Sequence, residues 1–392
     1  MKNYTGLRSK PHQVIEDDDI AAVVDVLKNK SLTQGLSVDK FEEEIAKKVG
    51  SEYAVVANSA TSILHLICMA IDMKPGDILW TVPNTFVASS NCALYCGGSV
   101  DFVDISKDDY NMDVEALELK LKEADSKGIL PKAIIPIHFG GEPAKMKRIY
   151  ELGKKYGCYV FEDASHALGS TYKGTKTGSC QYSDGVVFSF HPVKIITSGE
   201  GGAFVTNSKS LAEKVSLLRS HGITRDEKQM AAHPEGPWYY QQIDLGFNYR
   251  LTDIQAALGI TQINKLEKFI EKRNSIADFY DEKLRGLPLN TPTRYDDTKS
   301  SWHLYVIRLQ LDELSMSRKE IFNQLWERNI PVNVHYIPVH TQPYYQNLGF
   351  KTGDFPNAEK HYQEALSLPM HCNIDFEELE KVVEGVHELL SK

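Results

Sequence analysis

Short apolar runs alternate with amphipathic stretches through the first two-thirds of the chain. Residues 143–157 have helical periodicity, and similar stretches separate most of the apolar runs. Strands that alternate with helices usually form a mainly parallel sheet with helices on both faces, so this pattern predicts an α/β fold. The runs that we interpret as buried strands are YAVVA, ILWTVP, SVDFVDI, AIIPIHF and YVFEDA.

Two helices are predicted around the first of these runs. Val14–Lys30 is amphipathic, with Ile20, Val23, Val24 and Leu27 on one face and acidic residues near its start. The second helix opens in NSATSILHLICMAI, directly after YAVVA. A strand that leads into a helix in this way places the first helical turn where open α/β folds bind their ligands.

The pattern changes in the last third of the chain. A long helical pattern from Thr252 to about Leu287 leads into a smaller set of elements, which predicts a separate α+β unit. We therefore expect a large domain over residues 1–265 and a small C-terminal domain over residues 266–392. The elements expected in the small domain are a strand at His303–Leu311, a helix near Ser317–Arg328, a strand at VNVHYI and a final helix from Asp375.

Composition and charge argue against several classes of protein. The proportions of apolar residues, 42%, and charged residues, 25%, are ordinary for a globular protein. The net charge is −9 without a long basic run, so we expect no nucleic-acid partner. Neither a run of 18 apolar residues nor a signal-peptide pattern occurs, so we expect a cytoplasmic protein with no membrane span. Cys92 and Cys96 have no accompanying His or Cys cluster, so we expect no metal site.

One lysine stands between two apolar runs in the stretch FSFHPVKIITSGEGGAFVTN. Lys194 follows the first run, and a glycine-rich turn, Gly199–Gly202, precedes the second. A lysine that is shielded from water has a lowered pKa and becomes a usable amine nucleophile. The stretch alone leaves open a strand-end lysine that extends its amine into solvent.

Two further stretches place polar groups at strand ends. NSATS offers the N–H groups of a helix start and the hydroxyls of Ser59 and Thr61, which suit a phosphate, although ordinary helix capping gives the same pattern. FEDASHALGS ends a strand with Asp163, which either meets a cationic ligand group or caps a turn. His166 taken alone is more typical of a structural histidine.

Together the three stretches predict a ligand with a phosphate, a ring nitrogen that becomes positive and an aldehyde that condenses with an amine. Pyridoxal 5′-phosphate (PLP) has all three groups. Lys194 would bind it as a Schiff base. Asp163 would keep the ring nitrogen protonated, which makes the ring a better electron sink.

The sequence resembles the DegT-type sugar-nucleotide aminotransferases of PLP fold type I over essentially its whole length. The resemblance implies a PLP-binding large domain with a mainly parallel mixed sheet, followed by a smaller C-terminal α+β domain. The motifs that carry it are SLTQG, NSATS, EDASHALGS, FSFHPVKIITSGEGGAFVTN, LRSHGI, GFNYRLTDIQAALG, VHYIPVH and ALSLPMHCNI.

The resemblance also implies a reaction and an assembly. The reaction is amination of C4 of a UDP-linked 4-keto-6-deoxy-N-acetyl-hexosamine, with L-glutamate as the amino donor, in pseudaminic acid biosynthesis. A different UDP- or dTDP-linked 4-keto sugar is the alternative substrate. The assembly is a homodimer with shared active sites, in which Asn248 reaches the cofactor phosphate of the neighbouring subunit.

The resemblance further implies roles for single residues. Lys194, Asp163 and His166 are the expected catalytic residues, and Phe86 is expected to stack on the cofactor ring. The expected cofactor-binding residues are Ser59, Ala60, Thr61, Phe86, Asp163, His166, Ser189, Lys194 and Asn248. The expected substrate-binding residues are Lys30, Ser31, Leu32, Thr33, His335, Tyr336, Ile337, Pro338 and Tyr345.

The chain departs from its relatives at two places. Relatives often have a tyrosine shortly before the first helix, where this chain has Lys10, Pro11 and His12. The insert from Thr224 to Asp244 is longer than in some relatives, and its Pro, Gly and aromatic residues suit either a loop over the active site or a surface loop.

Two rival functions share the fold. Sugar dehydratases of the family carry a histidine in place of the lysine, so Lys194 favours transamination. A non-catalytic sensor would have lost the lysine or the aspartate, and this chain has both Lys194 and Asp163.

Overall fold

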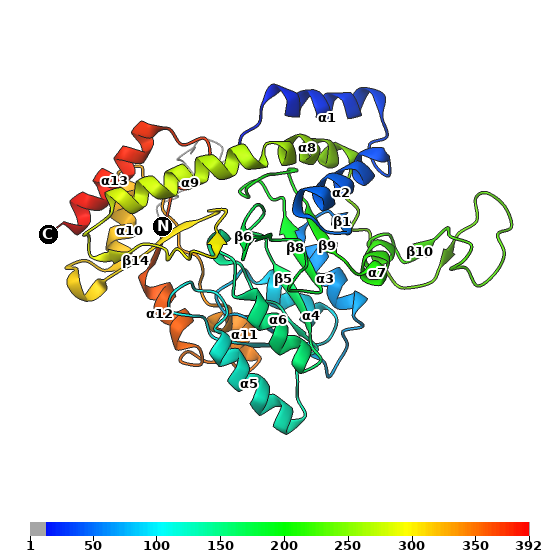
Figure 1. The fold of residues 1–392 in the computed structure, drawn as a ribbon, viewed down its shortest axis with the longest axis horizontal. Coiled ribbons are helices and arrows are strands. Elements are labelled where there is room, and N and C mark those ends of the chain that lie inside the picture. Colours follow the sequence, from blue (N-terminus) through cyan, green and yellow to red (C-terminus); the bar gives the residue numbers. More distant parts are fainter. Residues whose placement is uncertain (1–12, 392) are drawn as a thin grey trace.

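A seven-stranded sheet forms the centre of the computed structural model, which describes residues 13–391 (Figure 1). Lys10, Pro11 and His12 lie outside the described residues. Strand β9 is antiparallel to both of its neighbours, and the other strand pairs of this sheet are parallel. The prediction of a mainly parallel mixed sheet is therefore confirmed. In spatial order the strands are β1 (Tyr53–Ala57), β9 (Gly202–Thr206), β8 (Gly185–Ser189), β5 (Tyr159–Asp163), β4 (Ala133–Ile134), β2 (Ile78–Thr81) and β3 (Ser99–Phe102).

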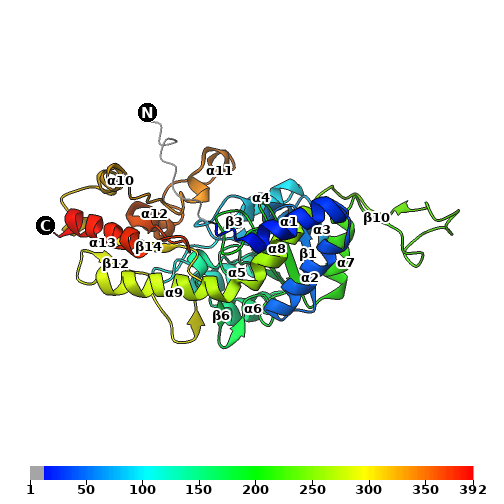
Figure 2. The same cartoon turned by 90° about the horizontal axis from the view of Figure 1, so that it is seen from above.

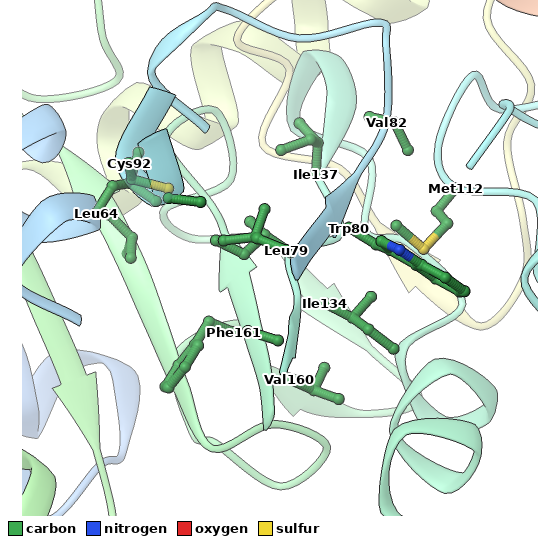
Figure 3. Packing of buried hydrophobic residues seen from close by; sticks show 14 of the residues in the cluster. Leu64, Leu79, Trp80, Val82, Cys92, Met112, Ile134, Ile137, Val160 and Phe161 are labelled. Carbon is green, nitrogen blue, oxygen red and sulfur yellow. The ribbon is translucent and has the colours of Figure 1, made fainter. Parts of the chain in front are cut away.

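Helices cover both faces of this sheet, because successive residues of each strand point to opposite sides. In β1, Val55 belongs to the apolar cluster that contains helices α3 and α7, whereas Val56 belongs to the cluster with α2 and α8. In β2, Leu79 points toward Leu64 of α3, and Trp80 points to the opposite side (Figure 3). The first eight helices are α1 (Asp17–Asn29), α2 (Leu36–Val49), α3 (Ala60–Ala70), α4 (Ala88–Tyr95), α5 (Val114–Lys127), α6 (Met146–Lys155), α7 (Lys209–Arg219) and α8 (Asp253–Asn264).

Capping residues explain where several of these helices begin and end. The side chains of Ser59, Asp113, Ser208 and Thr252 each accept a hydrogen bond from a backbone N–H of the first turn that follows them. Gly128 ends α5 with a φ of 68°, a left-handed conformation that glycine adopts without strain. Ser59 in NSATS is thus a true helix cap. It follows β1 and so lies near the carboxyl end of that strand.

The C-terminal part of the chain forms a second, smaller layer of helices around a three-stranded antiparallel sheet (Figures 1 and 2). A second apolar cluster lies here and includes Tyr280, Tyr305 and Leu325. Val306 on the same strand as Tyr305 instead joins the core of the large sheet, so the two cores meet at this strand. The boundary at residues 265 and 266 stays a prediction. The elements are α9 (Leu266–Lys283), β12 (Leu289–Asn290), β14 (Tyr305–Leu309), α10 (Arg318–Glu327), α11 (Pro343–Asn347), α12 (Pro356–Glu364), β15 (Ala365–Leu368) and α13 (Phe376–Leu390).

The prediction of a strand at VNVHYI is wrong. Only Asn333 pairs with a strand, through an isolated bridge to Ser367, and the third strand of the small sheet is β15 instead. The segment leaves the small sheet because it crosses to the large domain. The backbone N–H of Tyr336 donates to Asn84 Oδ1 at 3.2 Å, and that of Val339 donates to the Pro83 carbonyl at 2.9 Å.

The long helical pattern that starts at Thr252 is two consecutive helices, α8 and α9, with Lys265 between them. The Lys265 amine forms ion pairs with Glu16, Asp18 and Asp19, which begin or precede α1. These contacts hold α1 along α8 at the top of the view in Figure 1.

The insert from Thr224 to Asp244 extends away from the rest of the chain (Figures 1 and 2). Its base is a short hairpin of β10 (Ile223–Thr224) and β11 (Gln241–Gln242), which follows α7. We call residues 223–242 the arm. In the described chain the arm is therefore a projecting hairpin and not a loop folded over its own active site. Among residues 13–391, no helix is long and apolar enough to cross a membrane.

Candidate active site

A cavity of about 300 Å³, a size typical of ligand pockets, lies at the carboxyl edge of the large sheet. Asp163 is the last residue of β5 and Ser189 the last of β8, and Ser59 follows shortly after β1. Strands that are distant in sequence thus bring their ends to one place. The sequence-predicted residues that line the cavity are Ser59, Ala60, Thr61, Phe86, Asp163, His166, Ser189, Lys194 and Tyr336.

The N-terminus of α3 forms one wall. Ser59 caps the helix by accepting a hydrogen bond from the backbone N–H of Ser62 at 3.1 Å. The first turn, with Ala60 and Thr61, lines the cavity. Gly202 of β9 passes directly behind this turn, and a Cβ atom there would lie 2.4 Å from the Ala60 nitrogen. The close approach requires a glycine, and it fixes a helix start that suits an anion such as phosphate.

Asp163 forms the floor of the cavity and is 6% exposed. Its Oδ1 accepts the backbone N–H of Ser165 at 3.0 Å, and its Oδ2 accepts the hydroxyl of Ser89 at 2.7 Å. Because a buried carboxylate is costly without a positive or donating partner, this arrangement suits a cationic group of a ligand.

Lys194 lies in the loop between β8 and β9. The backbone N–H of Lys194 donates to the His191 carbonyl at 2.9 Å, and the Thr197 hydroxyl donates to the Phe190 carbonyl at 2.9 Å, so the loop is held as a tight turn. Burial lowers the pKa of Lys194 to about 8, and the negative charge of Asp163 partly opposes this shift. The amine therefore loses its proton far more readily than an ordinary lysine, as a nucleophile requires.

His166 and Tyr336 form a hydrogen-bonded pair at the cavity wall. The backbone N–H of Gly140 donates to His166 Nδ1 at 3.3 Å, so Nδ1 carries no proton. The proton of the neutral ring is then on Nε2, which lies 3.1 Å from the Tyr336 hydroxyl and donates to it. Burial, with the nearby charge of Lys194, holds the pKa of His166 well below its usual value, and burial raises the pKa of Tyr336. Both groups stay neutral, and the tyrosine keeps a proton to donate.

Comparisons with known proteins identify the class of enzyme. The model of the DegT/DnrJ/EryC1/StrS aminotransferase family matches residues 13–387. The chain belongs to this family. It is 42% identical to a Campylobacter jejuni protein named UDP-4-amino-4,6-dideoxy-N-acetyl-beta-L-altrosamine transaminase, over 97% of each chain.

Solved structures of the family have the same fold. Helicobacter pylori PseC, described as an aminotransferase involved in the biosynthesis of pseudoaminic acid, superposes with a TM-score of 0.88 and 32% identity, covering 98% of this chain and 99% of that chain. A Streptococcus pneumoniae protein described as a putative sugar aminotransferase in its PLP form superposes with a TM-score of 0.86 and 28% identity, covering 96% of this chain and 98% of that chain. This chain is therefore a PLP-dependent transaminase, as its sequence predicted.

The cavity contains the groups that PLP needs. The start of α3 offers backbone donors for a phosphate, Asp163 offers a buried carboxylate for a ring nitrogen, and Lys194 offers an amine with a lowered pKa. Phe86 lines the same cavity with a 60% exposed ring. The residues present therefore fit the cofactor of the family.

The structure does not bring every predicted residue to this cavity. Asn248 is exposed on the segment between the arm and α8. Lys30 and Ser31 line a different cavity beside α1 and α8, and Leu32 and Thr33, also exposed, continue the same segment. In a single chain these residues are thus separate from the site.

The remaining predicted substrate residues lie behind or beside the cavity. His335 Nδ1 bonds the Ser367 hydroxyl at 2.8 Å, Ile337 is exposed and Pro338 is buried. Tyr345 is 2% exposed, and its hydroxyl lies 2.6 Å from both the Ser90 hydroxyl and Asn91 Oδ1. The structure therefore places Tyr345 in the core below α4, where its hydroxyl already has partners.

Sequence reasoning missed five polar residues that line the cavity, namely Thr85, Ser89, Ser165, His191 and Glu200. Thr85 and Ser89 are four residues apart in the stretch NTFVASS, just after a predicted strand. Two hydroxyls at that spacing in a buried stretch could have indicated a polar site, because buried polar groups need hydrogen-bond partners.

Proposed function

We propose that this transaminase moves the amino group of L-glutamate to C4 of a UDP-linked 4-keto-6-deoxy-N-acetyl-hexosamine, a step of pseudaminic acid biosynthesis. The names of the Campylobacter jejuni and Helicobacter pylori relatives support this substrate. An aminotransferase for another UDP- or dTDP-linked 4-keto sugar is the second candidate, because relatives with other names also cover the chain.

The observation that carries the chemistry is that Lys194 and Asp163 line the same cavity, with the pKa of Lys194 lowered to about 8. Bound PLP supplies an aldehyde carbon for condensation with amines and a ring that stabilises negative charge on the neighbouring carbon. With a pKa of about 8, about one in ten Lys194 amines is neutral at pH 7. The Lys194 amine would hold the cofactor, and when free it would serve as the base that carries a proton during transamination.

The other cavity residues have roles in holding the cofactor and in polarising it. Asp163 would accept a hydrogen bond from the protonated ring nitrogen and keep that nitrogen charged. The first turn of α3, with Ser59, Ala60 and Thr61, would hold the phosphate together with Ser189, and Phe86 would cover the ring. His166 donates to the Tyr336 hydroxyl, which leaves the phenol proton directed to a ligand.

A homodimer with shared active sites is part of the proposal. Asn248 and the Lys30–Thr33 segment are exposed and lie outside the cavity of their own chain, as residues that serve a partner's cavity would. The surface around them carries exposed apolar side chains on α1, on the 31–36 segment, on the arm and after it, which is typical of an interface. These side chains include Ile20, Leu27, Leu32, Leu36, Trp238, Tyr240, Leu245 and Phe247.

A cytoplasmic location is also part of the proposal. All six cysteines are free thiols. Proteins of reducing compartments keep their cysteines in this form.

The substrate is tested with a panel of 4-keto sugar nucleotides, glutamate and the purified enzyme, with product structures determined by NMR. The proposal expects the highest kcat/KM for a UDP sugar with an acetamido group, with a new amine at C4. A site with placed polar partners discriminates strongly against analogues that leave those partners unpaired. Preference for a dTDP sugar without the acetamido group would support the second candidate. Loss of a C3 hydroxyl without amination would indicate a dehydratase.

A further inference from the structure

Two buried hydroxyls in the cavity wall have no role in the function proposed above. Thr85 is 4% exposed and Ser89 is 1% exposed, and both line the cavity. The Thr85 hydroxyl lies 3.0 Å from the Ser89 hydroxyl, and the Ser89 hydroxyl donates to Asp163 Oδ2 at 2.7 Å. The three side chains form a hydrogen-bonded chain that ends at the carboxylate facing the cavity.

The direction of this chain follows from the number of protons. A carboxylate only accepts hydrogen bonds, so the single proton of Ser89 goes to Asp163. In the contact between the two hydroxyls, Thr85 must therefore be the donor. The backbone N–H of Ser165 donates to Oδ1, so each oxygen of Asp163 already has one protein donor. The carboxylate is fixed at both oxygens before any ligand enters.

We propose that Ser89, supported by Thr85, is a positioning residue that fixes the rotamer of Asp163 toward the PLP ring nitrogen. The inference rests on the role proposed for Asp163. A hydrogen bond donated to a carboxylate by a fixed hydroxyl is strong and holds the carboxylate in one orientation. Without the Ser89 donor, Asp163 rotates more freely and is held less firmly toward the ring nitrogen.

The test compares PLP with its 1-deaza analogue, in which a C–H replaces the ring nitrogen. Dissociation constants are measured by fluorescence titration of the cofactor-free protein. In the wild type we expect tighter binding of PLP than of the analogue. Ser89→Ala should weaken the binding of PLP about tenfold, as for a lost hydrogen bond to a charged group, and leave the analogue unchanged. Ser89→Thr, which keeps the hydroxyl, should restore PLP binding.

Two further variants separate positioning from stability. Thr85→Val keeps the shape of the side chain but removes its proton, so it should weaken PLP binding about threefold, in the same direction as Ser89→Ala. Ser90→Ala is the matched control. Ser90 follows Ser89 on α4 and is 0% exposed, but its hydroxyl lies 3.0 Å from the Val87 carbonyl and 2.6 Å from the Tyr345 hydroxyl. This variant should lower the Tm without changing the preference for PLP over the analogue.

An equal loss for PLP and for the analogue in Ser89→Ala would show a merely structural hydroxyl and overturn the inference. Unchanged PLP binding in Ser89→Ala would overturn it as well. If the wild type binds both ligands equally, Asp163 does not act on the ring nitrogen. The proposed role of Asp163 then fails first, and the inference fails with it.

Discussion

At the scale of single residues, the chemistry of the cavity depends on the amine of Lys194. Its burial favours the neutral form, and the carboxylate of Asp163 favours the charged form. The first effect is larger, so the pKa of the amine falls to about 8 from an ordinary value of about 10.4. A half-buried lysine near a fixed carboxylate is therefore reactive near neutral pH but still able to hold a proton.

This balance predicts a pH dependence in the cofactor-free protein. Competitive labelling with acetic anhydride, followed by mass spectrometry, measures the reactivity of Lys194. Only the neutral amine reacts, so the labelling rate should rise with pH to a plateau, with a midpoint near 8. In Asp163→Asn the midpoint should move lower, because the charge that raises the pKa is gone. A midpoint near that of exposed lysines, or an upward shift in the variant, would contradict this balance.

The sequence identified the residues that stand at or near the ends of strands, such as Asp163, Ser189 and Lys194, because local pattern marks those positions. It could not identify the bond between Ser89 and Asp163, since 74 residues separate them. Two side chains so far apart in sequence meet only because the order of the strands in the sheet brings their elements together. A local stretch of sequence does not reveal that order.

At the scale of elements, the site depends on the close approach of β9 to the start of α3. Gly202→Ala would place a Cβ atom 2.4 Å from the Ala60 nitrogen, so backbone atoms must shift. We expect a loss of about 1–3 kcal/mol in the free energy of unfolding and at least a roughly tenfold weaker binding of PLP, because the displaced turn is the proposed phosphate site. Thermal unfolding and fluorescence titration measure the two effects.

Gly174→Ala is the control for this prediction. Gly174 lies in the turn between β6 (Thr171–Tyr172) and β7 (Thr175–Lys176), with a φ of 78°, and a Cβ atom added there would have no neighbour within 4 Å. The variant should lose stability through backbone strain alone and bind PLP normally. Equal PLP affinity in the two variants would show that the Gly202 contact is unrelated to the phosphate.

Element prediction was accurate where strands are buried on both faces. YAVVA coincides with β1, because a short apolar run followed by a capped helix has few alternatives. VNVHYI has the alternating pattern of a strand, but Tyr336 and Val339 bond to the loop after β2 in the large domain. The alternating pattern arises here because the segment is partly buried between the large sheet and the small sheet. Alternation in the sequence does not distinguish this kind of burial from that of a strand.

At the scale of the whole molecule, four of the nine predicted substrate-binding residues, Lys30–Thr33, are exposed in one chain and separate from the cavity. The proposed dimer explains this separation, because the Lys30–Thr33 segment and Asn248 of each chain would complete the cavity of the partner chain. The sequence suggested the dimer only through its resemblance to a family. Nothing in the pattern of one chain distinguishes an interface from any other exposed apolar surface.

Mixed dimers test the shared site. Lys194→Ala and Asn248→Ala chains are mixed, and subunit exchange is confirmed with differently tagged chains. If Asn248 serves the partner's cavity, each heterodimer has one intact site and one doubly damaged site, so activity should reappear at up to half of the wild-type level per heterodimer. Each variant alone, treated in the same way, is the control. Confirmed exchange without recovered activity would show that both residues serve the cavity of the same chain.

The central claim is that Lys194 is the amine that binds PLP, and borohydride reduction of the holoenzyme tests it most directly. Reduction makes the bond between the cofactor and its lysine permanent, so peptide mass spectrometry can locate it. We predict a pyridoxyl-phosphate mass on the peptide that contains Lys194, and no such mass at any site in Lys194→Ala. A modified residue other than Lys194 in the wild type, or a wild type that binds PLP without any fixed lysine, would contradict the account.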